Sequence, residues 1–332
     1  MKLIAAFAAT ALLCGCESMQ YYAQAIGGHL SVMRAARPVE SWLADPGTPQ
    51  DLRARLELAH GIREFASREL GLPQNGSYSS YADLGRPYVV WNVYAAPEFS
   101  TEARKECFPF TGCVSYRGFF SEQDARRHAE KLRLDGNDVF VGGVPAYSTL
   151  GWFDDPLLST YIRYPDVQLA RLLFHELAHQ ELYARDDTAF NESFAVAVEE
   201  AGVRRWLRAQ GREAEFTAFQ AAQARRRELA ARVQATRKRL EAVYQSDLPP
   251  DQKLRLKADE FSKLRADYGR IVPVRSAPVR SAPTNWARMT PMDWLPGSAP
   301  MFAPASRAPR RLAFRRYPMI RVSRRSASLR SV

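Results

Sequence analysis

The chain has 332 residues, of which 46% are hydrophobic and 25% charged, and this composition excludes a wholly disordered or fibrous protein. Its formal net charge of +11 is concentrated at one end. Residues 271–332 contain 12 arginines and one acidic residue, whereas residues 1–270 contain 35 basic and 35 acidic residues. The body of the chain is therefore electrically balanced, and the basic excess does not by itself indicate a nucleic-acid partner.

The first 15 residues have the features of an export signal. Lys2 gives a positive start, and the apolar run 3–14 has the length of a signal-peptide core but is too short to cross a bilayer. The run ends in Leu13-Cys14-Gly15-Cys16, which resembles the bacterial lipobox, where a Cys after a small residue receives lipid. We expect residues 1–15 to be removed and Cys16 to carry the lipid; an ordinary secretory signal cleaved nearby is the alternative.

A lipidated, exported chain would lie in the bacterial cell envelope, anchored to a membrane and facing the periplasm. Glu17, rather than Asp, follows Cys16, and by resemblance to enteric lipoproteins this favours the outer over the inner membrane. Export also places Cys107 and Cys113 in an oxidising compartment, where two thiols six residues apart can form a disulfide. A metal-binding pair is the alternative, although such pairs more often have about two to four intervening residues.

The hydrophobic pattern predicts helices, then strands, then helices again. Residues 21–67 are predicted to be helical with a break at 45–47, after which Thr48 is expected to cap a helix that begins at Pro49. Residues 71–85 have the composition of a loop. Strands are predicted at 88–94, 114–120 and 138–141, and helices at 121–134, 167–185, 188–209, 213–245 and 250–269. This order favours the α+β class, mostly helical, with a small mixed sheet and a long C-terminal helical hairpin.

The last 62 residues, 271–332, differ from the rest in composition. They contain nine of the 21 prolines and cannot bury enough apolar surface to order themselves, so we expect a disordered basic tail. Anion binding by its arginines is an alternative, but export argues against nucleic acid. A shift of reading frame near Ile271 is a further explanation, because a GC-rich gene encodes Arg-, Pro-, Ser- and Ala-rich sequence out of frame.

The segment 174–180 contains the pattern His-Glu-x-x-His. The spacing of four places His175 and His179 on one face of a helix, about one turn apart, so that both can reach a single Zn²⁺. Glu176 lies beside that ion, where it can take a proton from the attacking water. A chance match is the alternative, but an uninterrupted helix with a buried stripe argues against it; the stripe comprises Leu169, Leu172, Leu173 and Leu177.

Zinc in a hydrolase takes a third protein ligand and keeps one position open. If helices 167–185 and 188–209 pack antiparallel, Glu192 lies about 7.5 Å beyond the turn and His179 about 9 Å before it, at about 1.5 Å per residue. Glu192 is therefore the expected ligand. Glu199, two turns further on, is either a partner of His175 or a surface residue. The acidic candidates for this third ligand are Asp186, Asp187, Glu192, Glu199 and Glu200.

These motifs, with the segments 142–156 and 190–195, resemble the predicted aminopeptidase lipoproteins of proteobacteria, a gluzincin-type group. The resemblance covers about residues 16–270 and implies a zincin-like zinc metallopeptidase. It implies His175, His179 and Glu192 as ligands and Glu176 as general base. One position departs from the thermolysin pattern, because Val196 stands where an Asp would support a zinc-binding His. That support must come from elsewhere in the chain.

Gluzincins commonly place a substrate-pairing edge strand before the zinc helix, which here corresponds to residues 141–156. Gly142 and Gly143 would let a peptide backbone approach closely, and Tyr147 could offer its hydroxyl to the oxyanion. The alternative is a Gly-Pro turn with a packed Tyr147; Tyr161 and Tyr164 are less favoured candidates. Asp154 and Asp155 are available to hold a substrate amine, but capping of a helix is the favoured role for them.

The sequence therefore predicts a lipid-anchored zinc metallopeptidase, with an aminopeptidase as the favoured type. The alternative is a zinc-stabilised envelope binding or scaffold lipoprotein without turnover, which would have no need of Glu176. We expect a signal at 1–15, a metallopeptidase domain at 16–270 and the tail at 271–332. The expected partners are a peptide substrate and a membrane, not nucleic acid, and no sequence feature indicates an oligomeric state.

Overall fold

The computed structural model describes residue 19 and residues 21–108, 112–184 and 187–272. Helical residues 21–35 are followed by β1 (Ala36–Pro38), α2 (Val39–Ala44), α3 (Gln50–Arg68), β2 (Ser80–Ala82), β3 (Val90–Pro97), β4 (Glu106–Phe108), β5 (Gly112–Val114), β6 (Arg117–Phe119), α4 (Glu122–Leu134), β7 (Asn137–Val144) and β8 (Leu157–Leu158). The chain ends in α5 (Asp166–Glu181), α6 (Thr188–Ala209), α7 (Ala214–Gln245) and α8 (Pro250–Ile271). The predicted class, α+β and mostly helical, is confirmed.

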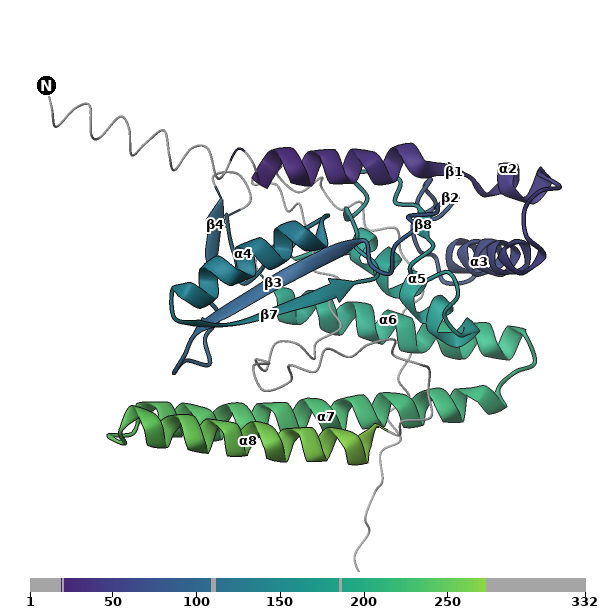
Figure 1. Ribbon diagram of the computed structural model, residues 1–332. Helices are drawn as coiled ribbons and strands as arrows, with labels where there is room; N and C mark the ends of the chain where they lie inside the picture. The colour runs from purple at the N-terminus through teal and green to yellow at the C-terminus, as the bar shows by residue number, and fades with distance from the viewer. Residues whose placement is uncertain (1–18, 20, 109–111, 185–186, 273–332) are drawn as a thin grey trace, which may run out of the picture.

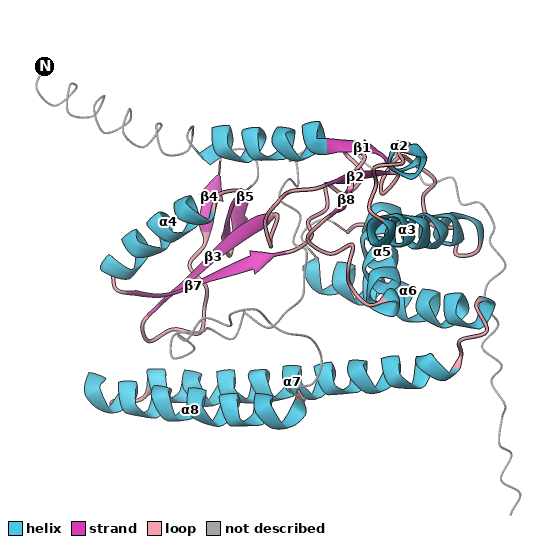
Figure 2. Ribbon diagram, turned by 45° about the vertical axis from the view of Figure 1, so that its right-hand side comes forward, coloured by secondary structure: helices cyan, strands magenta, loops and turns pink. Residues whose placement is uncertain are grey.

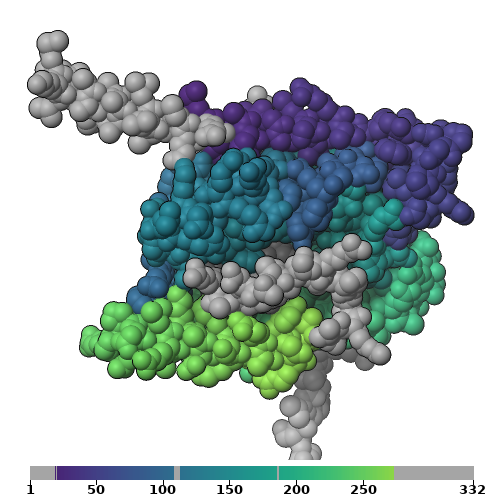
Figure 3. All heavy atoms as spheres, in the orientation of Figure 1, coloured from purple at the N-terminus to yellow at the C-terminus, as the bar shows by residue number. Residues whose placement is uncertain are grey.

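The elements lie in tiers between two helical edges. The helix at 21–35 runs along one edge of the molecule, and α7 and α8 lie side by side along the opposite edge (Figure 1). Between them lie α5 and α6, packed against each other, and the sheet that contains β3 and β7 (Figure 2). The space-filling view shows the same two edges, in purple and green (Figure 3).

The longest strands, β3 and β7, form an antiparallel sheet with β6, in the order β6-β3-β7. The register pairs Val90 with Val144 and Pro97 with Asn137. Helix α4 covers one face of this sheet, and a small apolar core that includes Trp91 and Leu132 fills the space between them. Among the described residues β7 pairs only with β3, so its outer edge is not paired.

A larger core surrounds α5. Three of its predicted stripe residues, Leu169, Leu173 and Leu177, are fully buried, and Leu172 is partly buried against the same core. Burial of each such leucine contributes about 1.5–3 kcal/mol. The apolar face predicted from the spacing therefore anchors the helix that carries the His-Glu-x-x-His pattern.

A buried arginine on α3 fixes the loop that follows this helix. The guanidinium of Arg63 donates to the carbonyl oxygens of Ser77 (2.8 Å), Pro73 (2.8 Å) and Asn75 (3.0 Å). The planar fork of an arginine suits several acceptors at once. The same loop reaches α5, because Asn75 donates to Gln180 (2.8 Å) and Gln180 donates to Ser77 (3.3 Å). Loop 73–77 is thereby held against the end of α5.

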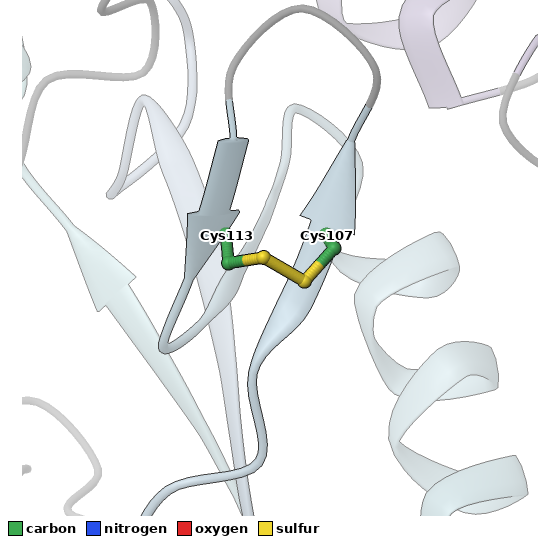
Figure 4. Close-up of a disulfide and its surroundings, with 2 residues drawn as sticks. All are labelled: Cys107 and Cys113. Carbon is green, nitrogen blue, oxygen red and sulfur yellow. A yellow bond between two sulfur atoms is a disulfide. The ribbon is translucent and has the colours of Figure 1, made fainter.

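A disulfide and a buried lysine make two further contacts. Cys107 and Cys113 form a disulfide across the antiparallel pair β4–β5 (Figure 4). On α8, the buried Lys257 donates to the Glu98 carbonyl (2.6 Å) and to Asp138, so the helical hairpin is tied to the end of the sheet.

Several predicted boundaries were wrong. The helix predicted at 167–185 ends at Glu181, and the strand predicted at 114–120 is divided between β5 and β6. The three-residue strands β1 and β2 lie in segments predicted to be helix and loop, because such short strands carry no alternating pattern. Thr48 does not cap α3: its hydroxyl donates to the Trp42 carbonyl (2.6 Å), and Pro49 is the cap.

The predicted terminal features mostly lie outside the described residues. These are the signal at 1–15, Cys16 and, except for its first two positions, the basic tail; α8 continues to Ile271. Within the described part of the chain, no helix has the length and apolar character needed to cross a membrane.

Candidate metal centre

Helices α5 and α6 bring three potential ligands to one point. His175 and His179 lie one turn apart on α5 and are almost fully buried, and Glu192 approaches them from α6. The two Nε2 atoms are 3.1 Å apart. The Glu192 oxygens lie 3.5 Å from each of these nitrogens. Each residue offers one ligand atom, and the three atoms lie within 4.8 Å of one another. This is the set that the spacing predicts.

The start of α6 explains why Glu192 lies level with the histidines. Asp187 caps the helix by accepting from the Phe190 amide (2.9 Å). The buried side chain of Asn191 accepts from the Ala184 amide (2.7 Å) and donates to the Ala184 carbonyl (2.8 Å). Because Asn191 directly precedes Glu192, this pair of hydrogen bonds fixes the ligand's position relative to α5.

The other acidic candidates have different surroundings. Asp187 is the helix cap, and Glu200 accepts from Arg227 at the surface. Asp186 lies outside the described residues. Glu199 is buried, with 1% of its surface exposed, and accepts from His175 Nδ1 at 2.9 Å. Of the two alternatives for Glu199, the structure therefore shows the partner of His175 and not the surface residue.

The charges around the histidines favour a cation at this point. Burial opposes protonation of His175, but hydrogen bonds to Glu192 and Glu199 outweigh it and raise its pKa to about 10. Burial, with the neighbouring charge on His175, lowers the pKa of His179 to about 4. The pair thus accommodates one positive charge, not two. Two imidazoles and a carboxylate are a common zinc donor set, with ligand atoms about 2 Å from the ion. The residues present are compatible with zinc.

Glu176 lies in the interior beside two tyrosines. Its own side chain is only 2% exposed. Burial is the main cause that raises the pKa of Tyr78 and of Tyr161, and the Glu176 charge contributes in both cases. Tyr78 has a φ of 65°, in the left-handed region that non-glycine residues rarely adopt. The sequence did not indicate that Tyr78 lies near Glu176, because residues 71–85 were predicted only to form a loop.

Tyr147, the predicted oxyanion donor, is packed in the core. Its hydroxyl lies 2.7 Å from His29 Nδ1, and its ring meets Phe120 edge to face. Burial raises the pKa of this phenol, with Asp155 as the main nearby charge. This environment agrees with the alternative given for Tyr147, a side chain packed in the core. The rival Tyr161 donates its hydroxyl to the Pro156 carbonyl (3.1 Å), and Tyr164 is partly buried against the larger core.

Gly142 and Gly143 lie opposite Asn92 and Trp91 on β7, which is an edge strand of its sheet in the described part of the chain. A Cβ on Gly143 would lie 2.1 Å from the Tyr88 ring, and one on Gly142 would lie 2.7 Å from the Phe140 ring. Both glycines therefore make room for neighbouring aromatic side chains.

Asp155 is a buried structural acid in this fold. Its carboxylate accepts from the Thr149 amide (2.8 Å) and the Ser148 hydroxyl (3.3 Å). Burial raises its pKa to about 6. No helix begins at 154–155, so the predicted helix-capping role of these aspartates was wrong. With 2% exposure, the Asp155 side chain is closed to a substrate amine.

No curated protein and no solved structure matches this chain. A family model described as Putative aminopeptidase matches residues 20–289, which is most of the chain and includes every residue of the candidate metal centre. The match continues past Arg270, where the resemblance was expected to end, into the basic tail. The chain therefore belongs to the Putative aminopeptidase family.

Proposed function

We propose that the protein is a zinc-dependent aminopeptidase of the bacterial cell envelope. The observation that carries this proposal is the convergence of His175, His179 and Glu192, from two helices, beside the buried carboxyl of Glu176. Membership of the Putative aminopeptidase family supports a peptidase. The leucines of α5 are buried in the larger core, and the Asn191 hydrogen bonds hold the start of α6. Together they hold His175, His179 and Glu192 in place.

In this proposal His175, His179 and Glu192 hold zinc, which when bound polarises the scissile carbonyl and acidifies a water molecule. Glu176 takes the proton of the attacking water and delivers it to the leaving amine. Glu176 is 2% exposed, so its side chain is shielded from bulk water. Among the described residues β7 has no partner on its outer edge, where an extended peptide would pair with it.

The test is Glu176→Gln in the full-length protein, with zinc content and cleavage of a peptide library as the two measurements. We expect zinc to be retained and turnover to fall at least about 100-fold, because the general base is lost. Glu181→Gln, an exposed position on the same helix, is the matched control and should cleave normally. Normal cleavage by Glu176→Gln would rule out the mechanism.

Aminopeptidase activity has its own test. Peptides with a free N-terminus should be cleaved one residue at a time, and the same peptides with an acetylated N-terminus should not be. Internal cleavage of both sets would make the protein an endopeptidase. Zinc binding without cleavage of either set would instead support the scaffold alternative.

We also propose that Cys16 carries the lipid that anchors the protein to the outer membrane, facing the periplasm. The Leu13-Cys14-Gly15-Cys16 sequence supports this, and residues 1–18 lie outside the described structure. Metabolic labelling with palmitate should mark the wild type but not Cys16→Ser, and only the wild type should fractionate with the outer membrane. Equal labelling of both would refute the anchor without affecting the peptidase.

A further inference from the structure

His175 presents its two ring nitrogens to different neighbours. Its Nε2 atom faces His179 and Glu192, at 3.1 and 3.5 Å. Its Nδ1 atom lies 2.9 Å from Glu199 Oε2. In metal sites the partner of the second nitrogen fixes the tautomer and the orientation of the ring, and it raises the basicity of the ligating atom.

Glu199 on α6 is held by residues of two other helices, α5 and α7. Besides His175, it accepts from Arg171 Nη1 (2.9 and 3.2 Å) on α5 and from Gln223 Nε2 (3.2 Å) on α7. Glu199 is therefore a carboxylate whose hydrogen bonds leave it little freedom to turn.

The amide of Gln223 is oriented in turn by a fourth residue. Arg226 Nη1 donates to the Gln223 carbonyl oxygen at 3.2 Å, which leaves the amide nitrogen to donate to Glu199. Because an arginine has no acceptor, this contact fixes which end of the amide faces the carboxylate. Gln223 is 7% exposed, although α7 is otherwise a largely exposed helix.

We propose that Glu199, braced by Arg171 and Gln223, is the positioning residue for His175, and that α7 is consequently part of the metal centre. The proposal rests on the zinc function proposed above. It also answers the departure at Val196, whose side chain is 39% exposed and offers no polar group. Glu199 lies seven residues, or two turns, after Glu192 on α6. It contacts His175 at Nδ1, the ring nitrogen that does not face Glu192.

The first experiment compares Glu199→Gln with Glu200→Gln in the full-length protein. Glu200 is the matched control because it is the next residue on α6 and contacts only Arg227 near the surface among the contacts described. Zinc affinity is measured by competition with a chelator. We expect Glu199→Gln to bind zinc about 10–100-fold more weakly and Glu200→Gln to bind like the wild type. Equal affinity of all three proteins would overturn the proposal.

The second experiment tests the contribution of α7. Gln223→Met keeps the volume of the side chain and removes the donor to Glu199, so we expect zinc affinity to fall in the same direction but by less. A ¹⁵N NMR spectrum of the zinc-loaded protein should show His175 protonated at Nδ1 in the wild type, with that signal shifted in both variants. An unshifted signal in Glu199→Gln would show that the residue has only a packing role.

These outcomes separate the inference from the function on which it rests. If the wild-type protein fails to bind zinc, the proposed function fails. If the wild type binds zinc tightly and Glu199→Gln binds it equally well, the proposed function stands and the positioning role is refuted. Far-UV circular dichroism identifies any variant that has not folded, and Gln223→Met then carries the test.

Discussion

Asn191 closes the turn between α5 and α6 from the inside. It satisfies both the amide and the carbonyl of Ala184, and it is 2% exposed. Asn191→Leu would leave two backbone groups without this partner and should lower the free energy of unfolding by about 1–3 kcal/mol. Because Glu192 follows directly, zinc affinity should fall as well.

Urea denaturation and chelator competition measure these two effects of Asn191→Leu. Ser193→Ala is the control, since Ser193 is exposed and bonds only its own helix, at the Ala189 carbonyl (2.6 Å), in the contacts described. A stable Asn191→Leu variant with normal zinc affinity would show that the turn keeps its geometry without this side chain.

Because its pKa is raised, Asp155 should make the free energy of unfolding depend on pH. Burial raises its pKa from 3.8 to about 6. Between these values the folded protein holds a proton that the unfolded chain releases, so the free energy of unfolding should fall as the pH rises through this window and level off above it. The change attributable to Asp155 is about 3 kcal/mol.

Urea denaturation of the wild type and of Asp155→Asn, at about pH 4 and about pH 7, tests this sign. The amide does not titrate, so the variant should gain stability relative to the wild type as the pH rises. If the two stability curves run parallel, Asp155 is not the group responsible.

At the scale of elements, a side chain at either glycine of β7 would overlap a neighbouring aromatic ring. Gly143→Ala would place a Cβ 2.1 Å from the Tyr88 ring and should cost about 1–3 kcal/mol of stability through overpacking. The same substitution should cost much less in a Tyr88→Ala background. A double-mutant cycle measured by thermal unfolding checks this. Equal costs in both backgrounds would point to a requirement of the strand itself.

The hairpin formed by β4 and β5 depends on its disulfide. The bond between Cys107 and Cys113 closes a loop of seven residues, for which the chain-entropy relation gives about 2 kcal/mol. Adding a reductant should therefore lower the stability of the wild type by about this amount. The Cys107→Ser/Cys113→Ser variant should start lower and show no response to reductant; a response there would mean that another group is being reduced.

What the sequence could predict depended on the range of the interactions. His175, His179 and Glu192 were found because helical periodicity and one short turn relate them. The contact of Tyr147 with His29 spans 118 residues, and no local pattern carries it. The role of Glu199 stayed open for the same reason, since its surroundings depend on Gln223 of another helix. Tyr78 lies in a loop whose shape is set by Arg63 of α3.

At the scale of the whole molecule, several contacts join the helical hairpin to the rest of the chain, and two of them involve the buried side chains of Gln223 and Lys257. Gln223 connects α7 to the centre of α5 and α6 through Glu199, and Lys257 connects α8 to the sheet at Glu98 and Asp138. Both contacts bury polar groups that would be costly to leave without partners. The hairpin therefore supports the candidate metal centre through Gln223 and β7 through Lys257.

The candidate metal centre and the residues that contact Glu199 also occupy one continuous stretch of the chain. The ligands, Glu176, Arg171, Glu199 and Gln223 all lie between residues 171 and 223, whereas the loop at 73–77 and the edge strand β7 come from far earlier in the sequence. Contacts between residues near in sequence form faster than distant ones. During refolding from denaturant with zinc present, zinc binding should therefore recover before peptide cleavage. The order in which the two functions return would record the order in which the molecule assembles.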